Sequence, residues 1–522
     1  MSEPGAADGE AAQVDARLVP AALTGWIVTA AGTVWPIGYA LAVCCVVLAA
    51  TSGALWWSTA RARCRTQLAA MSAGLVAIGV VGAGYGLAIA LRADAVAHHP
   101  ITAAFGTAAT VTVTPTESAL SLGRGRLLFR ATLQRLHDDE ISGRVVVFAR
   151  ASDFSPVLVG QPLRFTARIA RPVRHDLTVA VLNAAGRPRV GRAAAVQRAA
   201  HIVRSRFATV AQEVLPADEA ATLPALVLGD TSLVTVATSG EFRSAGMTHL
   251  MAVSGANVTI VCAAVLFSAR LVGPRAAVFL AALVLVAFVI VVQPTASVLR
   301  AAVMGGIALV GMLSSRRRQA IPALSASVLI LTAATPRLAV DIGFALSVVA
   351  TAALVVIGPV WSRGLVARGV PKPLSDALAV AGAAQVVTAP LVAGVSGRFS
   401  VVAVGANIAV AAVIAPITVL GSAAAVLAVA WPAGADLLIR FTGPELWWVL
   451  RTAHWAACVP GATVAVPSGV PGVLVIVLGT VLVTVCWRWR WFRVVVGSAM
   501  AAALFCLFAW VVGGLLAGGR SF

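Results

Sequence analysis

Long uncharged apolar stretches alternate with short basic segments along most of this chain. The first stretch, residues 18–60, contains no charged residue and carries Trp35-Pro36-Ile37-Gly38 near its middle. Because about 20 apolar residues cross a bilayer, this stretch predicts a helical hairpin, and residues 67–91 predict a third span. Further membrane segments are predicted at 249–270, 276–293, 297–314, 319–335, 338–359, 376–396, 400–432, 470–487 and 494–517.

The arginines at the turns predict the orientation of these segments. Arg61, Arg63 and Arg65 follow the hairpin, and basic turns favour the cytoplasmic side. The N-terminus is then cytoplasmic, and the residues after Arg92 lie outside. If the segment at His249 enters from outside, the later basic turns also lie inside: Arg270 and Arg275, Arg316 to Arg318, Arg363, Arg368 and Lys372, and 487–493.

This orientation requires the 400–432 stretch to return to the face that it leaves. Pro416 interrupts the stretch, so we expect a broken or re-entrant hairpin there. Residues 436–454 are then expected to form an amphipathic segment on the outer surface.

Residues 92–187 have a different pattern, in which apolar and polar residues alternate over short runs. The runs lie between Gly, Pro and Asp residues, at 110–113, 126–133, 145–148 and 163–169. Such alternation is typical of half-buried strands, so we expect a small β-barrel. Its phenylalanines are expected to be core residues: Phe129, Phe148, Phe154 and Phe165.

A helix is expected at 193–215, directly after the β-domain. Phe207 and Val210 belong to its apolar side, whereas Arg198 and Arg204 belong to its basic side. Two interpretations remain open for this helix, a position on the lipid surface and a contact with nucleic acid.

Composition and charge agree with a membrane protein. The chain is 60% hydrophobic and only 11% charged, which excludes an ordinary soluble globular protein. Its net charge of +19 comes from arginine, with Lys372 the single lysine. This excess fits anionic lipid and nucleic acid equally well.

These patterns predict a polytopic α-helical membrane protein with about 10–13 membrane segments. A small extracytoplasmic β-barrel is inserted after the third span. We expect a disordered cytoplasmic tail (1–17), a three-span region (18–91), the β-domain (92–187), an amphipathic connector (188–222), a second membrane domain (223–432) and a C-terminal amphipathic segment with two spans (433–522).

Motifs of soluble enzymes are missing from the sequence. There is no Gly-rich phosphate loop at Lys372, no His-Glu-x-x-His and no Gly-x-Ser-x-Gly. The seven cysteines form no Cys-x-x-Cys pair, so neither a zinc site nor a disulfide is expected. We therefore expect no enzyme activity, no metal and no cofactor.

Polar residues within the apolar stretches are the candidate functional groups, because polar groups in hydrocarbon are costly unless they are paired or line a wet cavity. They are His249, Ser254, Gly255, Asn257, Arg300, Asp341, Ser347, Gln385 and Asn407. A pore or binding site is one interpretation. In the other, Ser254 and Asn257 bond to nearby backbone, Arg300 reaches the outer interface and Asp341 caps a helix.

Several short elements follow one another between Leu223 and Pro416. They are Leu228-Gly229-Asp230, Gly246-Met247-Thr248-His249-Leu250-Met251-Ala252-Val253-Ser254-Gly255, Ser297-Val298-Leu299-Arg300-Ala301, Gly343-Phe344-Ala345-Leu346-Ser347 and a late Asn407. In this order they resemble the ComEC competence family of DNA-uptake channels. The N-terminal spans and the external β-domain, which is OB-like in that family, resemble its layout too.

The resemblance implies an inner-membrane channel that translocates single-stranded DNA into the cytoplasm during natural transformation. It implies a DNA-receptor protein outside, and a motor ATPase or single-strand-binding proteins inside; an oligomer is compatible with it. The family commonly has histidine where this chain has Asn257, which leaves only a hydrogen-bonding role there. Many members also carry a C-terminal metallo-β-lactamase-like domain. We expect this chain to lack it, so that any strand degradation requires a separate nuclease.

A polyanion needs a wet passage with weak, repeated contacts, and the candidate polar residues fit such a lining. Asp341 does not suit a polyanion directly, so we hypothesise that it pairs with Arg300 or His249. In the β-domain, an arginine-lined groove is a candidate DNA contact, with a solvated basic face as the alternative. Its residues are Arg124, Arg126, Arg130, Arg164, Arg168, Arg171 and Arg174.

Two further functions remain open. A secondary transporter of a small solute or a lipid-linked substrate would use the same polar helices as a closed midplane site. A membrane-embedded hydrolase would use Ser254 and His249.

Overall fold

The computed structural model describes residues 15–61, 66–154, 158–174, 176–293, 295–313, 320–486, 488–491, 493–495 and 497–498. The predicted tail up to residue 14, Arg63, Arg65, the Arg316 to Arg318 turn and most of the 494–517 span lie outside these residues. Within them, six helices are long and apolar enough to cross a membrane, and five shorter apolar helices accompany them. The expected multi-pass membrane fold is therefore confirmed.

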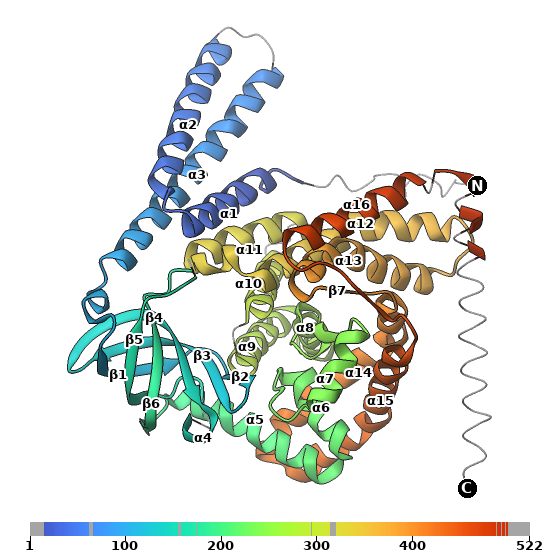
Figure 1. Ribbon diagram of the computed structural model, residues 1–522. Helices are drawn as coiled ribbons and strands as arrows, with labels where there is room; N and C mark the ends of the chain where they lie inside the picture. The colour runs from blue at the N-terminus through green and yellow to red at the C-terminus, as the bar shows by residue number, and fades with distance from the viewer. Residues whose placement is uncertain are drawn as a thin grey trace.

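The N-terminal region consists of α1 (Val19–Val34), α2 (Gly38–Arg61) and α3 (Thr66–Ala97). The break that Pro36 predicts separates α1 from α2. Glycines on α3 let α2 approach closely, since an added Cβ on Gly79 would lie 2.7 Å from the Cys45 carbonyl oxygen and one on Gly86 2.9 Å from the Ala42 nitrogen. The α2–α3 hairpin projects away from the rest of the molecule (Figure 1).

The strands that follow α3 form a closed barrel. After η1 (Pro100–Ala104) they are β1 (Ala108–Pro115), β2 (Leu120–Gly123), β3 (Arg126–Leu136), β4 (Asp139–Arg150), β5 (Leu163–Ala170) and β6 (Ala180–Val190). Around the barrel the order is β1-β5-β6-β4-β3, and the pairing of β3 with β1 closes it. β2 pairs antiparallel with the first residues of β3. Among the described strands, only β4 and β6 pair in parallel. This closed five-stranded barrel with a non-sequential order fits the OB-like expectation.

Alternation along the strands places one set of side chains inside the barrel. Phe129, Phe165 and Phe154, the last from the short helix α4 (Ala151–Phe154), are buried, with Phe154 and Phe165 rings 5.1 Å apart. Phe148 is half-buried on the outside, where it lies beneath the Arg126 guanidinium. The expectation of core phenylalanines is thus confirmed for three of the four.

Helix α5 (Ala195–Val214) follows the barrel, as predicted, but most of its apolar side faces protein. Phe207, Val210 and Ala211 are buried in the core of the second membrane domain, where α5 packs against α6 (Ala217–Leu228), α9 (Pro274–Val292) and α14 (Ala403–Ala430). Protein therefore covers most of this side, which argues against the lipid-surface interpretation, although Ile202 stays exposed.

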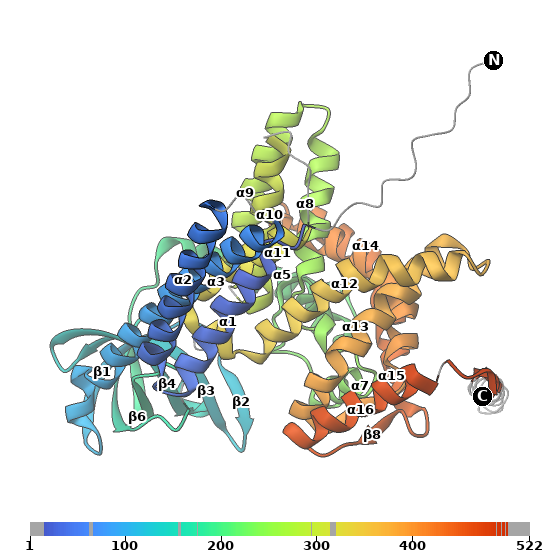
Figure 2. The same cartoon turned by 90° about the horizontal axis from the view of Figure 1, so that it is seen from above.

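The second membrane domain contains a ring of neighbouring helices. Its members are α8 (Gly255–Ala269), α10 (Ala296–Leu313), α12 (Ile342–Val366), α13 (Lys372–Ser396) and α14. In this order each packs against the next, and α14 packs against α8 (Figure 2). α11 (Ala320–Ala334) and η3 (Pro336–Val340) connect the ring to α1.

The 400–432 stretch does not form the predicted broken hairpin. Pro416 lies inside one continuous helix, α14, and the chain turns back at Trp431 into α15 (Pro432–Cys458). α15 packs along α14, with Trp448 Nε1 donating to the Ala409 carbonyl at 2.8 Å. A proline inside a long helix is tolerated where neighbouring helices pack against it, which explains the error.

The chain nevertheless returns to the side from which the 400–432 stretch starts, as the predicted orientation requires. β7 (Arg398–Ser400) precedes α14, β8 (Thr463–Ala465) follows α15, and these two strands pair antiparallel before α16 (Val470–Cys486). Two antiparallel helices therefore make the return that a re-entrant hairpin was expected to make. Residues 436–454 belong to α15, and their expected position on the outer surface stays a prediction.

Candidate functional site

Three helices of the ring begin around the side chain of Arg300. Arg300 lies in the second turn of α10, and its Nε donates to Ser347 Oγ of α12 at 2.8 Å. Ser347 Oγ in turn donates to Ser297 Oγ at 3.3 Å. A Cβ added to Gly255, the first residue of α8, would lie 2.9 Å from Arg300 Nη2. The guanidinium thus lies directly against the backbone of Gly255.

The Arg300 side chain is buried, with 6% of its surface exposed. Among the described residues no carboxylate lies within 4.0 Å of it, and its Nη1 donates to the Met304 sulfur at 3.2 Å. The alternative in which Arg300 reaches the outer interface is therefore wrong. A buried cation without an anion carries a large desolvation cost, which marks this group as a functional candidate.

Helix dipoles add to this positive charge. The N-termini of α8, α10 and α12 carry partial positive charge, which the capping carboxylate of Asp341 offsets in part at α12, and all three helices contribute residues around Arg300. Such an arrangement favours an anion.

Asp341 does not pair with Arg300 or His249. Its Oδ1 accepts a hydrogen bond from the Phe344 backbone N–H at 2.8 Å, so it is the N-cap of α12. The pairing hypothesis is wrong, and the capping alternative is confirmed. A carboxylate at the first turn is stabilised by the backbone N–H groups and needs no cationic side chain.

Asn257 and Ser254 join α8 to the end of α6. Asn257 Nδ2 donates to the Leu226 carbonyl at 2.9 Å, and Ser254 Oγ donates to Asn257 Oδ1 at 3.2 Å. The Leu226 carbonyl lies in the last turn of α6, where carbonyls have no helical partner. Gly229 ends this helix with φ of 72°, which explains the glycine of the Leu-Gly-Asp element.

The Ser254 hydroxyl donates to Asn257 and not to His249. The hydrogen-bonded pair that a Ser254 hydrolase requires is therefore not formed in this structure. Asn257 itself is buried and has the hydrogen-bonding role expected from the sequence.

His249 belongs to η2 (Thr248–Leu250), in a loop that follows α7 (Val236–Ser244) and contacts the start of α14. Asn407 Nδ2 donates to the Ala403 carbonyl at 2.8 Å and approaches the Gly246 carbonyl at 3.4 Å. Gly246 has φ of 70°, and an added Cβ would lie 2.4 Å from the Ala403 Cβ. Only glycine allows this close approach.

Gln385 reaches the same corner from α13. Its Nε2 lies 3.4 Å from the Ser400 carbonyl, and Ser400 Oγ donates to the Ser244 carbonyl at 2.7 Å. The predicted residues therefore form two groups, one around Arg300 and one around the Ser244 to His249 loop. Both belong to the same helix ring, since α8 packs against α10 on one side and α14 on the other.

Most residues of the two groups are partly accessible. Asn257 and Arg300 are buried. His249 is exposed as a residue, although protein surrounds its imidazole, which bonds to the Gly246 backbone. The others are half-buried: Ser254, Gly255, Asp341, Ser347, Gln385 and Asn407. Three further serines, which were not among the predicted site residues, form hydrogen bonds within the two groups: Ser297, Ser400 and Ser244. The spacing of three between Ser297 and Arg300 on one helix is the signal that identifies the first of them.

The barrel arginines are distributed over two strands and several loops. Arg126 and Arg130 lie on β3 and Arg164 and Arg168 on β5, with β1 between these strands. Arg130 pairs with Glu117 at 2.9 Å and Arg164 with Asp138 at 3.5 Å, while Arg124, Arg171 and Arg174 are exposed in turns.

The outer face of β3 and β4 carries arginines that the sequence reasoning missed. Arg150 lies opposite Arg126, and Arg144 lies opposite Thr132. With the half-buried Phe148 between them, this face combines cationic groups with one aromatic ring. OB-folds bind single strands with this combination.

The barrel is fixed to the membrane domain by the segment before β2. Glu117 Oε1 accepts from Arg337 Nη1 at 2.8 Å, and Ser118 Oγ donates to Gln293 Oε1 at 2.8 Å. Burial alone raises the pKa of Glu117, but the hydrogen bonds and charges of Arg337 and Arg130 outweigh it and lower the pKa below its usual value. Glu117 therefore connects the barrel to η3 as a carboxylate.

Comparison with known proteins identifies the family. The model of the family described as Competence protein matches residues 226–492, a stretch of 267 residues in a chain of 522. The chain belongs to this family. The matched region contains both polar groups. It continues past Pro416, where the interval that carries the sequence resemblance ends.

One curated relative supports the same assignment. ComE operon protein 3 of Bacillus subtilis (strain 168) is 27% identical over 207 residues, which cover 39% of this chain. The match covers 26% of that relative's length, so most of the relative lies outside the aligned part. No solved structure matches this competence protein.

Proposed function

We propose that this chain is an inner-membrane channel that translocates single-stranded DNA into the cytoplasm during natural transformation. Membership in the competence family supports a role in DNA uptake. The observation that carries the channel proposal is Arg300, a buried cation with no carboxylate partner among the described residues, where the N-termini of α8, α10 and α12 meet.

The charge of the strand explains why such a group is useful. Each nucleotide carries a negative charge, and crossing hydrocarbon is prohibitive unless a lumen supplies hydrogen-bond donors. A phosphate that passes Arg300 compensates the buried guanidinium and also meets the helix N-termini. Three further candidate side chains of the ring helices are uncharged: Ser347, Gln385 and Asn407. Their contacts with the DNA strand therefore stay weak enough for the strand to move on.

Contacts among the turns support the proposed orientation, with the barrel outside the cell. Turns that the arginine pattern assigns to the outside contact one another or the barrel, namely Gln293 with Ser118, Arg337 with Glu117, and Ser400 with Ser244. The described turns that the arginine pattern assigns to the cytoplasmic side, between α8 and α9 and between α12 and α13, lie away from the barrel (Figure 2).

Uptake of labelled DNA by a strain that lacks this chain tests the proposal. Restoring the chain should restore nuclease-resistant label inside the cells, whereas the Arg300→Gln variant at equal abundance should not. Arg270→Gln is the matched control, because Arg270 is exposed and lies over the Phe267 ring at the α8–α9 turn. Undiminished import in the deletion strain, together with a growth defect on one solute, would favour the secondary transporter instead.

A further inference from the structure

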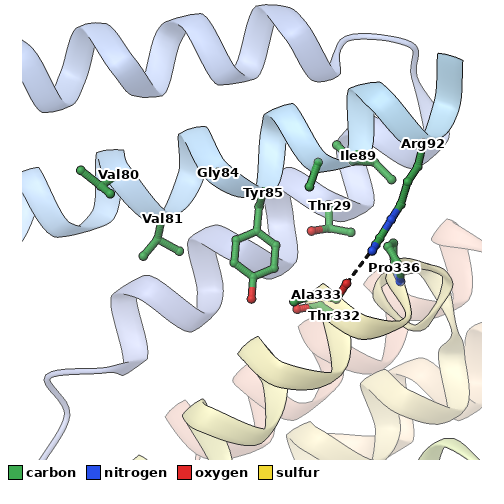
Figure 3. A pocket seen from close by; sticks show the side chains of 11 residues that line it. Thr29, Val80, Val81, Gly84, Tyr85, Ile89, Arg92, Thr332, Ala333 and Pro336 are labelled. Atoms are coloured by element: carbon green, nitrogen blue, oxygen red, sulfur yellow. Dashed lines mark hydrogen bonds between the residues drawn. The ribbon is translucent and has the colours of Figure 1, made fainter. Parts of the chain in front are cut away.

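A crevice of about 220 Å³ lies between α1, α3 and α11, away from both polar groups (Figure 3). Its walls are mainly apolar and include Val80, Val81 and Ile89 of α3. Val80 and Gly84 are exposed at its edge. Because α3 is one of the six membrane-capable helices, this edge faces hydrocarbon in a bilayer.

Hydroxyl groups along the crevice already have partners. Tyr85 Oη donates to the Leu329 carbonyl at 2.6 Å, and Thr29 Oγ1 donates to the Gly25 carbonyl at 2.6 Å. Thr332 Oγ1 donates to the Val328 carbonyl at 2.7 Å. A hydrocarbon occupant therefore leaves none of these three hydroxyl groups unsatisfied.

Arg92 closes one end of the crevice. Its Nη1 donates to the Ala333 carbonyl at 2.9 Å, which holds the guanidinium at the end of α11, and the side chain is exposed (Figure 3). Nε and Nη2 make no hydrogen bond to any described residue. These two donors match the paired oxygens of a phosphate.

Further arginines make this end of the crevice positive. Partial burial lowers the pKa of the Arg144 guanidinium, and the nearby charges of Arg337 and Arg92 lower it further. Glu117 pairs with Arg337 and Arg130, not with Arg92. The guanidinium of Arg92 is thus left without a carboxylate partner within 4.0 Å among the described residues.

We propose that this crevice binds one acyl chain of an anionic phospholipid and that Arg92 holds its phosphate. The dimensions agree, since Val80 and Arg92 are about 18 Å apart along α3 at 1.5 Å per residue. One leaflet of hydrocarbon is about 15 Å thick. The lipid fills the space between the N-terminal helices and α11, so it stabilises the contact between the two membrane regions.

Two variants test the two halves of the proposal. Arg92→Gln removes the phosphate partner. Gly84→Leu fills the crevice, and an added Cβ there meets no atom within 4 Å, so the helix tolerates it. Matched controls are Arg61→Gln, at the opposite end of the α2–α3 hairpin, and Gly74→Leu, at a position of α3 with the same open space.

The full chain is purified from mixed micelles of phosphatidylglycerol and phosphatidylcholine, and the phospholipid retained per protein is measured by native mass spectrometry. We expect one retained phosphatidylglycerol in the wild type and both controls, and at least a fivefold loss in both test variants. Inorganic phosphate should not displace it. Thermal unfolding in detergent shows that each variant is folded.

Several outcomes would overturn the proposal. They are unchanged retention in either test variant, equal retention of the two phospholipids, and displacement of the lipid by inorganic phosphate. Displacement by a single-stranded oligonucleotide would also overturn it, because the end of the crevice would then be a nucleic-acid site.

Discussion

Arg300 Nε donates to Ser347 Oγ at 2.8 Å and thereby joins α10 to α12 beside the first residue of α8. A neutral hydroxyl holds this buried guanidinium in place, and no carboxylate in the described part of the chain lies within 4.0 Å of it. Its positive charge therefore remains for an anion that passes the helix N-termini. The account of DNA translocation depends on this relationship.

Replacing Arg300 with glutamine should reduce DNA import. A hydrogen bond to a charged group contributes about 1.5–3 kcal/mol, so import should fall roughly 10- to 100-fold. Nuclease-resistant labelled DNA inside cells is the measurement, normalised to protein abundance. Import within twofold of the wild type would contradict the role of this side chain.

Replacing Gly255 with alanine should displace the guanidinium, because the added Cβ would lie 2.9 Å from Arg300 Nη2. We expect DNA import by Gly255→Ala to fall toward the level of the Arg300→Gln variant. The double variant Gly255→Ala/Arg300→Gln should import as much DNA as Arg300→Gln alone. Gly306→Ala is the control, since no atom lies within 4 Å of its added Cβ. Independent, additive losses in the double variant would show that the two residues act separately.

Replacing Asn257 with alanine should lower the stability of the protein. The change leaves the Leu226 carbonyl unpaired in a buried position, at a cost of about 1–3 kcal/mol. Thermal unfolding in detergent is the measurement, with Thr259→Ala, an exposed position of the same helix, as the control. Equal melting temperatures for these two variants would argue against the bridge between α6 and α8.

The contact between the barrel and the membrane domain should depend on pH. The folded state lowers the pKa of Glu117, so its contribution to stability is present above the ordinary value of about 4.3 and is lost as the pH falls through the lower folded value. At pH 7 the free energy of unfolding of the wild type should exceed that of Glu117→Gln by about 1 kcal/mol. Melting curves between pH 3 and 7 should show this difference disappear at the acidic end. A difference that persists unchanged at pH 3 would contradict the assignment.

The sequence predicted the membrane helices well because their signal is local. Uncharged stretches, with breaks at Pro36 and at the basic turns, set the bounds of α1, α2, α9, α10, α11 and α13 within a few residues, whereas α12 continues to Val366, past the predicted end at 359. The barrel strands with strict alternation were also found. β6 was missed, because Gly186 and Pro188 interrupt its pattern.

The errors concern partners, which periodicity does not specify. Pro416 has the same local signature in a broken hairpin and in a packed helix, and only the neighbouring α15 decides between them. Asp341 could be assigned to Arg300 from charge alone, but the backbone N–H of Phe344 is nearer along the chain and needs no long-range contact. The division of the motif residues into two groups became visible only in the fold.

Cysteine accessibility tests the central claim most directly. In a variant that lacks the seven native cysteines, single cysteines replace Ser347, Gln385 and Asn407, and Ser327→Cys serves as a control because Ser327 is fully buried in α11. Membrane-impermeant thiol reagents should modify the three ring positions, and single-stranded DNA should protect them, while Ser327→Cys stays unmodified. Ring positions that remain unreactive during active DNA import would contradict a water-filled passage through this helix ring.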